Sequence, residues 1–192
     1  MKALTNIEGF LGDSDLSNFV ADAFADERVD GTRVLFIIPD STRSMPMPAM
    51  FRALHEALHR RVGKMDYLIA LGTHPPMQED AINAMLGVTA EQRATLYGDV
   101  GIFNHDWKNP LMLAHIGNLT EEQVAEISDG LLREEVPVTV NKRVFDYDLV
   151  CIVGPVFPHE VVGFSGGNKY FFPGVAGAEL LNVFHWLGAL IT

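Results

Sequence analysis

The sequence is short of cysteine and of positive charge. A single cysteine, Cys151, stands among 192 residues, so no disulfide can form within the chain, which is typical of a reducing compartment. Lys and Arg number 14 against 25 Asp and Glu, giving a net charge of -11. This balance disfavours binding to nucleic acid or to an anionic membrane, because both depend on clustered Lys and Arg. A small anionic substrate would need single cationic residues placed in a cleft.

Long hydrophobic runs are also missing. No segment reaches the roughly 18–20 apolar residues of a membrane span, and residues 1–10 lack the apolar stretch of a signal peptide. We therefore expect a cytoplasmic protein. Hydrophobic residues make up 48% of the chain and charged residues 20%, which is a globular balance. The length suits one domain with a sizeable core.

Strand and helix patterns alternate along the chain. Continuous apolar runs predict buried strands at 33–40 and 66–74. Amphipathic spacing predicts helices at 14–26, 48–62 and 77–87. Further strands are expected at 101–104, 111–116, 136–141 and 148–154, and further helices at 120–132 and 177–190. The alternation predicts a single α/β domain with an open, mostly parallel, Rossmann-like sheet and helices on both faces.

Polar residues follow three of the predicted strands. Asp40 and Arg43 come after the first, His74 closes the second, and the strand ending at Gly154 leads to His159. Carboxyl ends of parallel strands share one edge, where ligands bind, so we expect these side chains to converge. Arg43 could hold a carboxylate through its bidentate fork or pair with Asp40 at the surface. Two histidines suit a reaction that removes and returns a proton on either face of a carbon.

A glycine-rich turn precedes a lysine in the segment 163–169, GFSGGNK. Such a turn lets backbone N–H groups approach an anion, and Lys169 could pair with that anion or form a covalent bond. Further along, His185 could bind a metal. A P-loop would need Gly before the lysine and Ser or Thr after it, but Asn168 and Tyr170 stand there. The segment therefore indicates a cofactor site other than that of a P-loop ATPase.

The remaining histidines allow less specific interpretations. His55 and His59 are four apart on a predicted helix, a spacing compatible with a metal, but the charged neighbours Glu56, Arg60 and Arg61 favour a solvated face. His115 lies in an apolar strand and is expected to be a hydrogen-bonded core residue. His105, in the cluster Asn104-His105-Asp106-Trp107, could line a pocket or pack within an ordered loop.

Taken together, these motifs resemble the nickel-dependent lactate racemase family, specifically its N-terminal domain. The resemblance runs from about residue 33 to the end, through DSTR (40–43), GTH (72–74), PHE (158–160), GFSGGNK (163–169), FPG (172–174) and His185. It implies an isomerase: a racemase or epimerase of a 2-hydroxy acid, either lactate or a related hydroxy or sugar acid. It also implies a second, C-terminal domain that this chain lacks, so the fragment alone is expected to be inactive.

The resemblance further implies a nickel-pincer nucleotide, a pyridine mononucleotide whose sulfur groups hold nickel. Enzymes that synthesise this cofactor are implied partners, and an isolated domain need not carry it. Pro75 stands where the family commonly has Arg. The roles carried over are covalent attachment and cofactor binding for Lys169, Ser165, Gly166 and Gly167, nickel binding for His185, acid–base catalysis for His74 and His159, and substrate binding for Asp40 and Arg43.

Two other functions remain open from the residues themselves. The chain could be a non-catalytic module whose glycine-rich turn holds a phosphate or carboxylate. It could also be a metal-dependent hydrolase with His74 and His159 as zinc ligands. The hydrolase would need a third ligand, for which His105 and Asp106 are the candidates.

Overall fold

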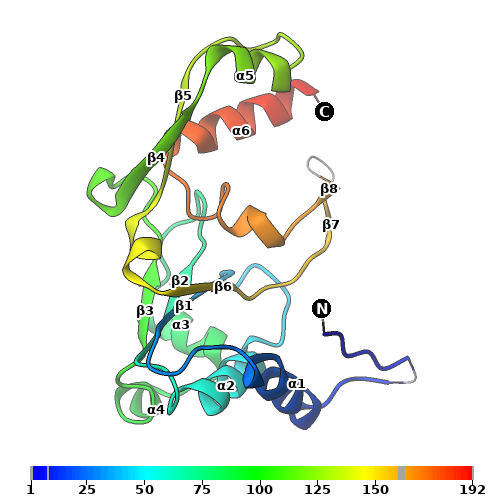
Figure 1. Cartoon of the computed structure of the whole chain (residues 1–192), viewed down its shortest axis with the longest axis vertical. Coiled ribbons are helices and arrows are strands. Elements are labelled where there is room, and N and C mark those ends of the chain that lie inside the picture. Colours follow the sequence, from blue (N-terminus) through cyan, green and yellow to red (C-terminus); the bar gives the residue numbers. More distant parts are fainter. Residues whose placement is uncertain (1, 8, 160–162, 192) are drawn as a thin grey trace.

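A four-stranded sheet forms the lower part of the molecule in Figure 1, and a two-stranded ribbon with two helices forms the upper part. The computed structural model describes residues 2–7, 9–159 and 163–191. All neighbouring strands of the larger sheet pair in parallel, in the order β3-β2-β1-β6. The α/β class predicted from the sequence is confirmed. The strands are β1 (Arg33–Ile38), β2 (Lys64–Ile69), β3 (Gly101–Asn104) and β6 (Leu149–Ile152).

One face of the parallel sheet is covered by α-helices. Alternate residues of a strand point to opposite faces, and Phe36 and Ile38 of β1 pack here with Phe51 of α2. At the end of α3, Gly87 adopts a φ of 65°, a left-handed conformation that glycine reaches without a Cβ penalty. The helices on this face are α1 (Asp13–Ala25), α2 (Met47–Leu58), α3 (Glu79–Leu86) and α4 (Ala90–Ala94).

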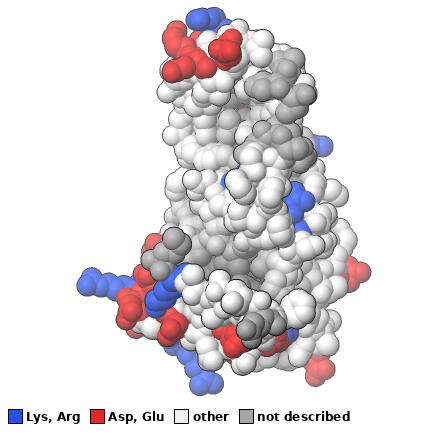
Figure 2. All heavy atoms as spheres, turned by 90° about the vertical axis from the view of Figure 1, so that its right-hand side faces the viewer, with Lys and Arg blue, Asp and Glu red and all other residues white. Residues whose placement is uncertain are grey.

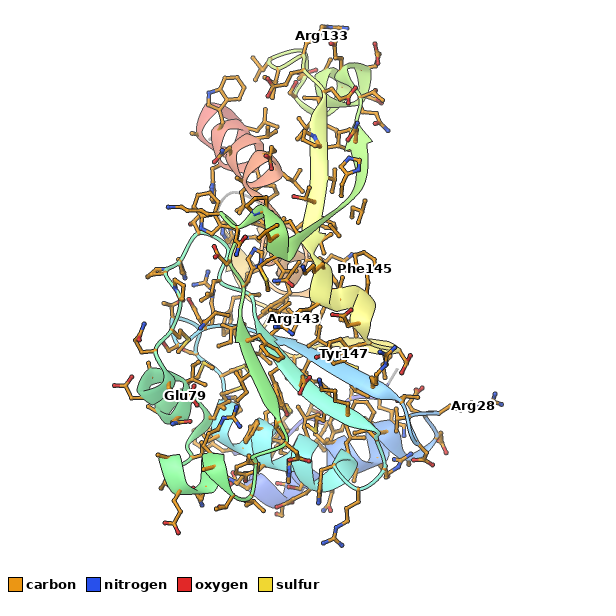
Figure 3. The ribbon with its side chains drawn as sticks, turned by 90° about the vertical axis from the view of Figure 1, so that its left-hand side faces the viewer. Arg28, Glu79, Arg133, Arg143, Phe145 and Tyr147 are labelled. Carbon is orange, nitrogen blue, oxygen red and sulfur yellow. The ribbon has the colours of Figure 1, made fainter. Side chains whose placement is uncertain are left out.

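The other face is covered by short 3-10 helices and irregular chain. Here Leu35 and Ile37 of β1 pack with Val175. Two 3-10 helices, η2 (Lys142–Asp146) and η3 (Gly167–Tyr170), belong to the covering segments. As Figure 3 shows, Arg143 of η2 and Tyr147, which directly follows η2, extend toward the sheet. The Arg143 guanidinium lies 3.5 Å from the Phe103 ring centre, and the Tyr147 hydroxyl donates to buried Asp66.

The upper part is built on an antiparallel pair of strands, β4 (Leu113–Leu119) and β5 (Val136–Asn141). Between them, α5 (Glu121–Ile127) begins after Thr120, whose side chain forms the predicted capping box with Gln123. The last helix, α6 (Ala178–Ile191), lies against β5. A small hairpin, β7 (Pro158–His159) with β8 (Gly163–Phe164), and the 3-10 helix η1 (Pro110–Met112) complete the elements.

Two histidines differ from their predicted environments. His55 is only 5% exposed, because it continues the apolar stripe of α2 and packs edge-on against the Tyr97 ring. Burial and the nearby His59 lower the pKa of His55. His115 is exposed rather than buried, because the β4–β5 ribbon turns one side to solvent. Its Nε2 lies 2.5 Å from Asn118 Oδ1.

Within the described residues, every helix is too short or too polar to cross a bilayer.

Candidate active site

The chain leaves β1 at a point where the sheet order reverses. Residues after β1 run toward β2 on one side, while β6 from much later in the chain pairs on the other side. In open α/β sheets such a switch point opens a crevice beyond the carboxyl ends of the strands, and ligands bind there. Asp40 follows β1 at this point, and Pro155 follows β6.

A cavity of about 210 Å³ occupies this crevice. It is lined by side chains from the ends of β1 and β2, from the β7–β8 hairpin, from η3 and from α6. The structure therefore brings together all the predicted site residues except Gly167, although their roles stay predictions. Those lining the cavity are Asp40, Arg43, His74, His159, Ser165, Gly166, Lys169 and His185.

Asp40 and His74 are in direct contact within this cavity. Asp40 Oδ2 lies 2.5 Å from His74 Nδ1, while Asp40 Oδ1 accepts from the Thr42 backbone N–H at 3.1 Å and from the Thr42 hydroxyl at 2.6 Å. Asp40 is 7% exposed. Burial by itself would raise the pKa of Asp40, but the hydrogen bonds from Thr42 and His74 outweigh it and the pKa is lowered. Asp40 is therefore ionised at neutral pH.

Arg43 is exposed at the cavity rim. Its backbone N–H donates to the Asp40 carbonyl at 3.3 Å, and its Nη1 lies 3.4 Å from the Thr42 hydroxyl oxygen. No ion pair joins Arg43 to Asp40, both of which the structure describes. The surface ion pair considered from the sequence is therefore not formed, and the guanidinium remains close to the cavity.

The loop that carries His74 is fixed at several backbone positions. Gly72 adopts a φ of 55°, and its N–H donates to the Gly174 carbonyl at 2.9 Å. The His74 N–H donates to the Leu71 carbonyl at 2.9 Å. Further along, the Asn104 side chain accepts from the Met77 N–H at 3.0 Å and donates to the Met77 carbonyl at 2.9 Å. The position of His74 is therefore defined from both sides of the loop.

The glycine-rich segment folds back against the chain that follows β6. Gly166 adopts a φ of 85°, and a Cβ there would lie 2.5 Å from the Pro155 carbonyl oxygen, so only glycine fits. The Ser165 hydroxyl donates to the Phe157 carbonyl at 3.2 Å and accepts from its N–H at 3.1 Å. Both residues line the cavity, and both also hold the segment in place against the β6 side.

Lys169 lies in η3, which follows this turn directly. Its backbone N–H donates to the Gly166 carbonyl at 3.1 Å, and its carbonyl accepts from the Gly174 N–H at 3.0 Å. Because Gly174 also bonds Gly72, the backbone around Lys169 is joined to the loop that carries His74. The amine-bearing residue and the candidate base are thus positioned by one connected network.

His159 and His185 approach the cavity from separate elements. His159 pairs with Gly163 in the β7–β8 hairpin; Glu160 of the same motif lies outside the described residues. His185 is exposed on α6, one helical turn beyond Leu181, which also lines the cavity. His185 does not pack in the core, and the neighbouring Trp186 is itself 46% exposed.

Tyr170 is a cavity residue that the sequence did not single out. It is 8% exposed, and its ring lies so close to Gly154 that a Cβ there would meet the hydroxyl oxygen at 1.9 Å. Burial raises the pKa of Tyr170 to about 12, with Arg43 opposing and Asp40 adding to the rise. Gly154 and Tyr170 gave only a weak sequence signal for this contact, because no spacing rule connects a glycine after a strand with a tyrosine after a lysine.

The His105 cluster does not line the cavity. His105 is 1% exposed and donates from Nε2 to the Ala176 carbonyl at 2.9 Å, while Asn141 Nδ2 lies 3.1 Å from its Nδ1. Burial lowers the pKa of His105 despite opposing contributions from Ala176 and Asp106. Among residues 2–7, 9–159 and 163–191, no group of three His, Cys, Asp or Glu could hold a metal by itself. The hydrolase interpretation thus finds no third ligand in the described residues.

Charge is distributed unevenly over the face shown in Figure 2. Acidic side chains gather toward the two ends of the molecule, while most of the surface between them is uncharged. Because Lys and Arg side chains also lie at both ends in this view, the middle of the face differs from the ends in having few charged side chains.

The fold and the cavity can be compared with known proteins. The family model described as lactate racemase N-terminal domain matches residues 13–191. The chain belongs to this family. Over 159 residues it is 26% identical to the lactate racemase of Thermoanaerobacterium thermosaccharolyticum, which covers 79% of this chain and 32% of that protein. The chain thus spans about a third of the length of this curated relative of the family.

Two solved structures share the fold. The crystal structure of a protein from Thermotoga maritima matches with a TM-score of 0.82 and 32% identity, covering 94% of this chain and 42% of the other. The lactate racemase apoprotein from Thermoanaerobacterium thermosaccharolyticum matches with a TM-score of 0.61 and 22% identity, covering 86% of this chain and 38% of the other. The second likeness concerns the fold alone.

Proposed function

We propose that this lactate racemase family chain contributes the catalytic cavity of an isomerase that racemises or epimerises a 2-hydroxy acid. The observation that carries the proposal is the shared cavity: Arg43, His74, His159, Lys169 and His185 come from separate segments and line one space of about 210 Å³. A cation, three imidazoles and an amine around a cavity at the carboxyl edge of a parallel sheet match the needs of this reaction better than those of a structural role.

The chain's own residues would bind the substrate and move its hydroxyl proton. Arg43 would hold the carboxylate of the hydroxy acid through its planar fork. His74 and His159 would act as acid and base on the hydroxyl group, one for each enantiomer. Two bases are needed because the hydroxyl group of the two enantiomers is presented differently to a fixed carboxylate anchor. Removal of the O–H proton leaves a 2-oxo acid once hydride has also left the carbon.

The donor set in the cavity fits a tethered nickel-pincer nucleotide. Lys169 offers an amine for covalent attachment and His185 an imidazole for nickel, and both line the cavity. Gly72, also at the cavity wall, has open space where a Cβ would stand. When bound, the cofactor supplies a cationic ring that accepts hydride from the substrate carbon and returns it. Ser165 and Gly166 would form the wall against which it lies.

We also propose that a second domain, of the kind that makes up the remainder of the relatives, closes over the cavity. Its support is the coverage of the curated relative, of which this chain spans 32%, and the exposure of Arg43 and His185 at the cavity rim. The enzymes that make the cofactor would be further partners. Closure would exclude water from the reacting carbon.

The test uses the full-length protein that carries this chain, produced together with the cofactor-synthesis enzymes. Separate D and L forms of lactate and other 2-hydroxy acids, deuterated at C2, are supplied, and the products are separated on a chiral column. We expect interconversion with the deuterium retained, because the same hydride is returned to the carbon. His74→Ala and His159→Ala should each lower the rate by about 10²–10⁴-fold.

Loss of deuterium to water would contradict the hydride mechanism. Absence of interconversion for every hydroxy acid, in protein that carries the cofactor, would contradict the isomerase and leave the anion-binding module as the better account.

A further inference from the structure

Both oxygens of the Asp40 carboxylate are already engaged by protein partners. One oxygen accepts two hydrogen bonds from Thr42, and the other lies 2.5 Å from His74 Nδ1. The residue is 7% exposed, whereas 45% of the His74 side chain is exposed. Asp40 is therefore the more deeply buried partner of the pair, although both residues line the cavity.

The protons on this pair are defined by the partners of Asp40. Thr42 supplies a backbone N–H, which can only donate, so Asp40 Oδ1 must accept. An ionised carboxylate is an acceptor at its second oxygen too. His74 Nδ1 must therefore carry the proton of their hydrogen bond, and in the neutral ring Nε2 is left unprotonated as the basic nitrogen.

Electrostatics argue in the same direction. A 2-hydroxy acid carries its own carboxylate, and a second carboxylate in contact with it would repel it. The same negative charge beneath an imidazole stabilises the imidazolium that forms when His74 takes a proton. The negative charge of Asp40 thus stabilises protonated His74 and would repel the carboxylate of the substrate.

We propose that Asp40 is a positioning residue that holds His74 as the Nδ1–H tautomer with Nε2 available as the base, rather than a ligand of the substrate. The role of Nε2 as a base rests on the proposed function, whereas the tautomer of His74 does not. The backbone supports the arrangement: the His74 N–H bonds the Leu71 carbonyl, and Asn104 clamps Met77 three residues later. Imidazole and carboxylate are both held by short, ordered segments.

The first test observes the tautomer directly and needs neither cofactor nor turnover. Long-range ¹H–¹⁵N spectra of the protein, recorded at about pH 9 where an ordinary imidazole is neutral, report which ring nitrogen is protonated. We expect His74 to carry its proton on Nδ1. A proton on Nε2 in the unsubstituted protein would overturn the proposal, whatever the variants do.

Asp40→Asn should invert the tautomer. The Thr42 N–H still requires an acceptor, so the amide oxygen of Asn faces Thr42 and the NH₂ group faces His74. Nδ1 must then accept, and the proton moves to Nε2. Thr42→Val is the matched control, because it removes the 2.6 Å hydrogen bond to the same carboxylate but keeps the backbone donor. It should leave the Nδ1–H form in place.

The second test compares kcat with KM in the cofactor-loaded, full-length enzyme. If Asp40 positions His74, Asp40→Asn lowers kcat by about 10²–10⁴-fold and changes KM little. Arg43→Lys serves as the comparison for a substrate ligand and should act mainly on KM. An Asp40→Asn variant with a raised KM and a parental kcat would overturn the positioning role. If the parent enzyme shows the Nδ1–H tautomer of His74 but no turnover, the result would count against the proposed function alone.

Discussion

Two histidines that follow neighbouring strands are surrounded by different groups. His74, after β2, faces a carboxylate and the cavity, whereas His105, after β3, is enclosed by the Ala176 carbonyl and the Asn141 side chain. Asn141 Oδ1 accepts from the Arg143 N–H, so its NH₂ group faces His105 Nδ1. A second ring proton on His105 would point at a donor. This ring is therefore held neutral, and it joins β3, β5 and the chain before α6.

We expect His105 to make stability depend on pH. Its folded-state pKa is lowered from 6.5, chiefly by burial, so the unfolded chain binds a proton first as the pH falls. The contribution is fully present above about 6.5 and is lost as the pH falls from there toward the folded-state pKa. His105→Gln retains a donor for the Ala176 carbonyl but cannot titrate. Urea unfolding at about pH 8 and about pH 5 measures the effect.

The variant should lose about 1–3 kcal/mol at the higher pH, because Asn141 loses its acceptor, and its free energy of unfolding should fall less between the two pH values than that of the parent. Equal falls in both proteins would exclude His105 as the titrating group.

At the scale of elements, the loops rather than the strands carry the site, and hydrogen bonds between loops position them. Gly174 joins the loop after β2 to the backbone of Lys169, and Asn104 at the end of β3 holds Met77. On the second face of the sheet, Tyr170 and Val175 pack in one cluster with buried residues of β1 and β2. The sheet supplies a rigid base, so a small shift of the loop after β2 would directly change the position of His74.

Asn104→Ala should loosen the His74 loop without unfolding the sheet. Two hydrogen bonds to Met77 are lost, each worth about 0.5–1.5 kcal/mol net, so amide exchange at Met77 should accelerate roughly tenfold or more. Asn109→Ala is a suitable control, because it removes a side-chain acceptor from the Leu111 N–H away from the cavity. Unchanged protection of Met77 in Asn104→Ala would show that the clamp does not fix the loop.

Much of the element pattern follows from local sequence signals. The bounds of β3 and β5 are as predicted, and Thr120 caps α5 as its spacing with Gln123 indicates. The same signal, Thr89 with Gln92, marks α4, which was not predicted. Separation of β4 and β5 into a ribbon depends on pairing between distant segments, which periodicity does not encode.

The sequence predicted which residues gather at the strand ends, but it did not predict which of their side chains are in contact. Convergence of Arg43, His74 and His159 follows from the parallel sheet. The contact between Asp40 and His74 does not, because the two residues are 34 positions apart and either could have faced other partners. Burial of His55 was missed because its flanking charges dominate the local pattern.

At the scale of the whole molecule, the ends of the parallel strands, the segment 155–174 and α6 surround one cavity. Asp40, Arg43 and His74 reach it from the ends of β1 and β2, and His185 reaches it from the helix that lies against β5. The cavity thus depends on both parts of the chain being folded together. Its cations, Arg43 and Lys169, lie in a protein with a net charge of -11, which makes a cofactor or substrate anion easier to hold there than elsewhere.

Intact-mass spectrometry of the protein, produced with and without the cofactor-synthesis enzymes, tests the central claim most directly. We predict a covalent mass increase only with those enzymes, located by digestion to the peptide that contains Lys169. Lys169→Ala should abolish the increase, whereas His185→Ala should retain the organic adduct and lose bound nickel. A lactate racemase produced in parallel serves as the positive control. If that control is modified and this protein keeps its unmodified mass, or if Lys169→Ala is modified as fully as the parent, the account of the cavity as a tethered-cofactor site is contradicted.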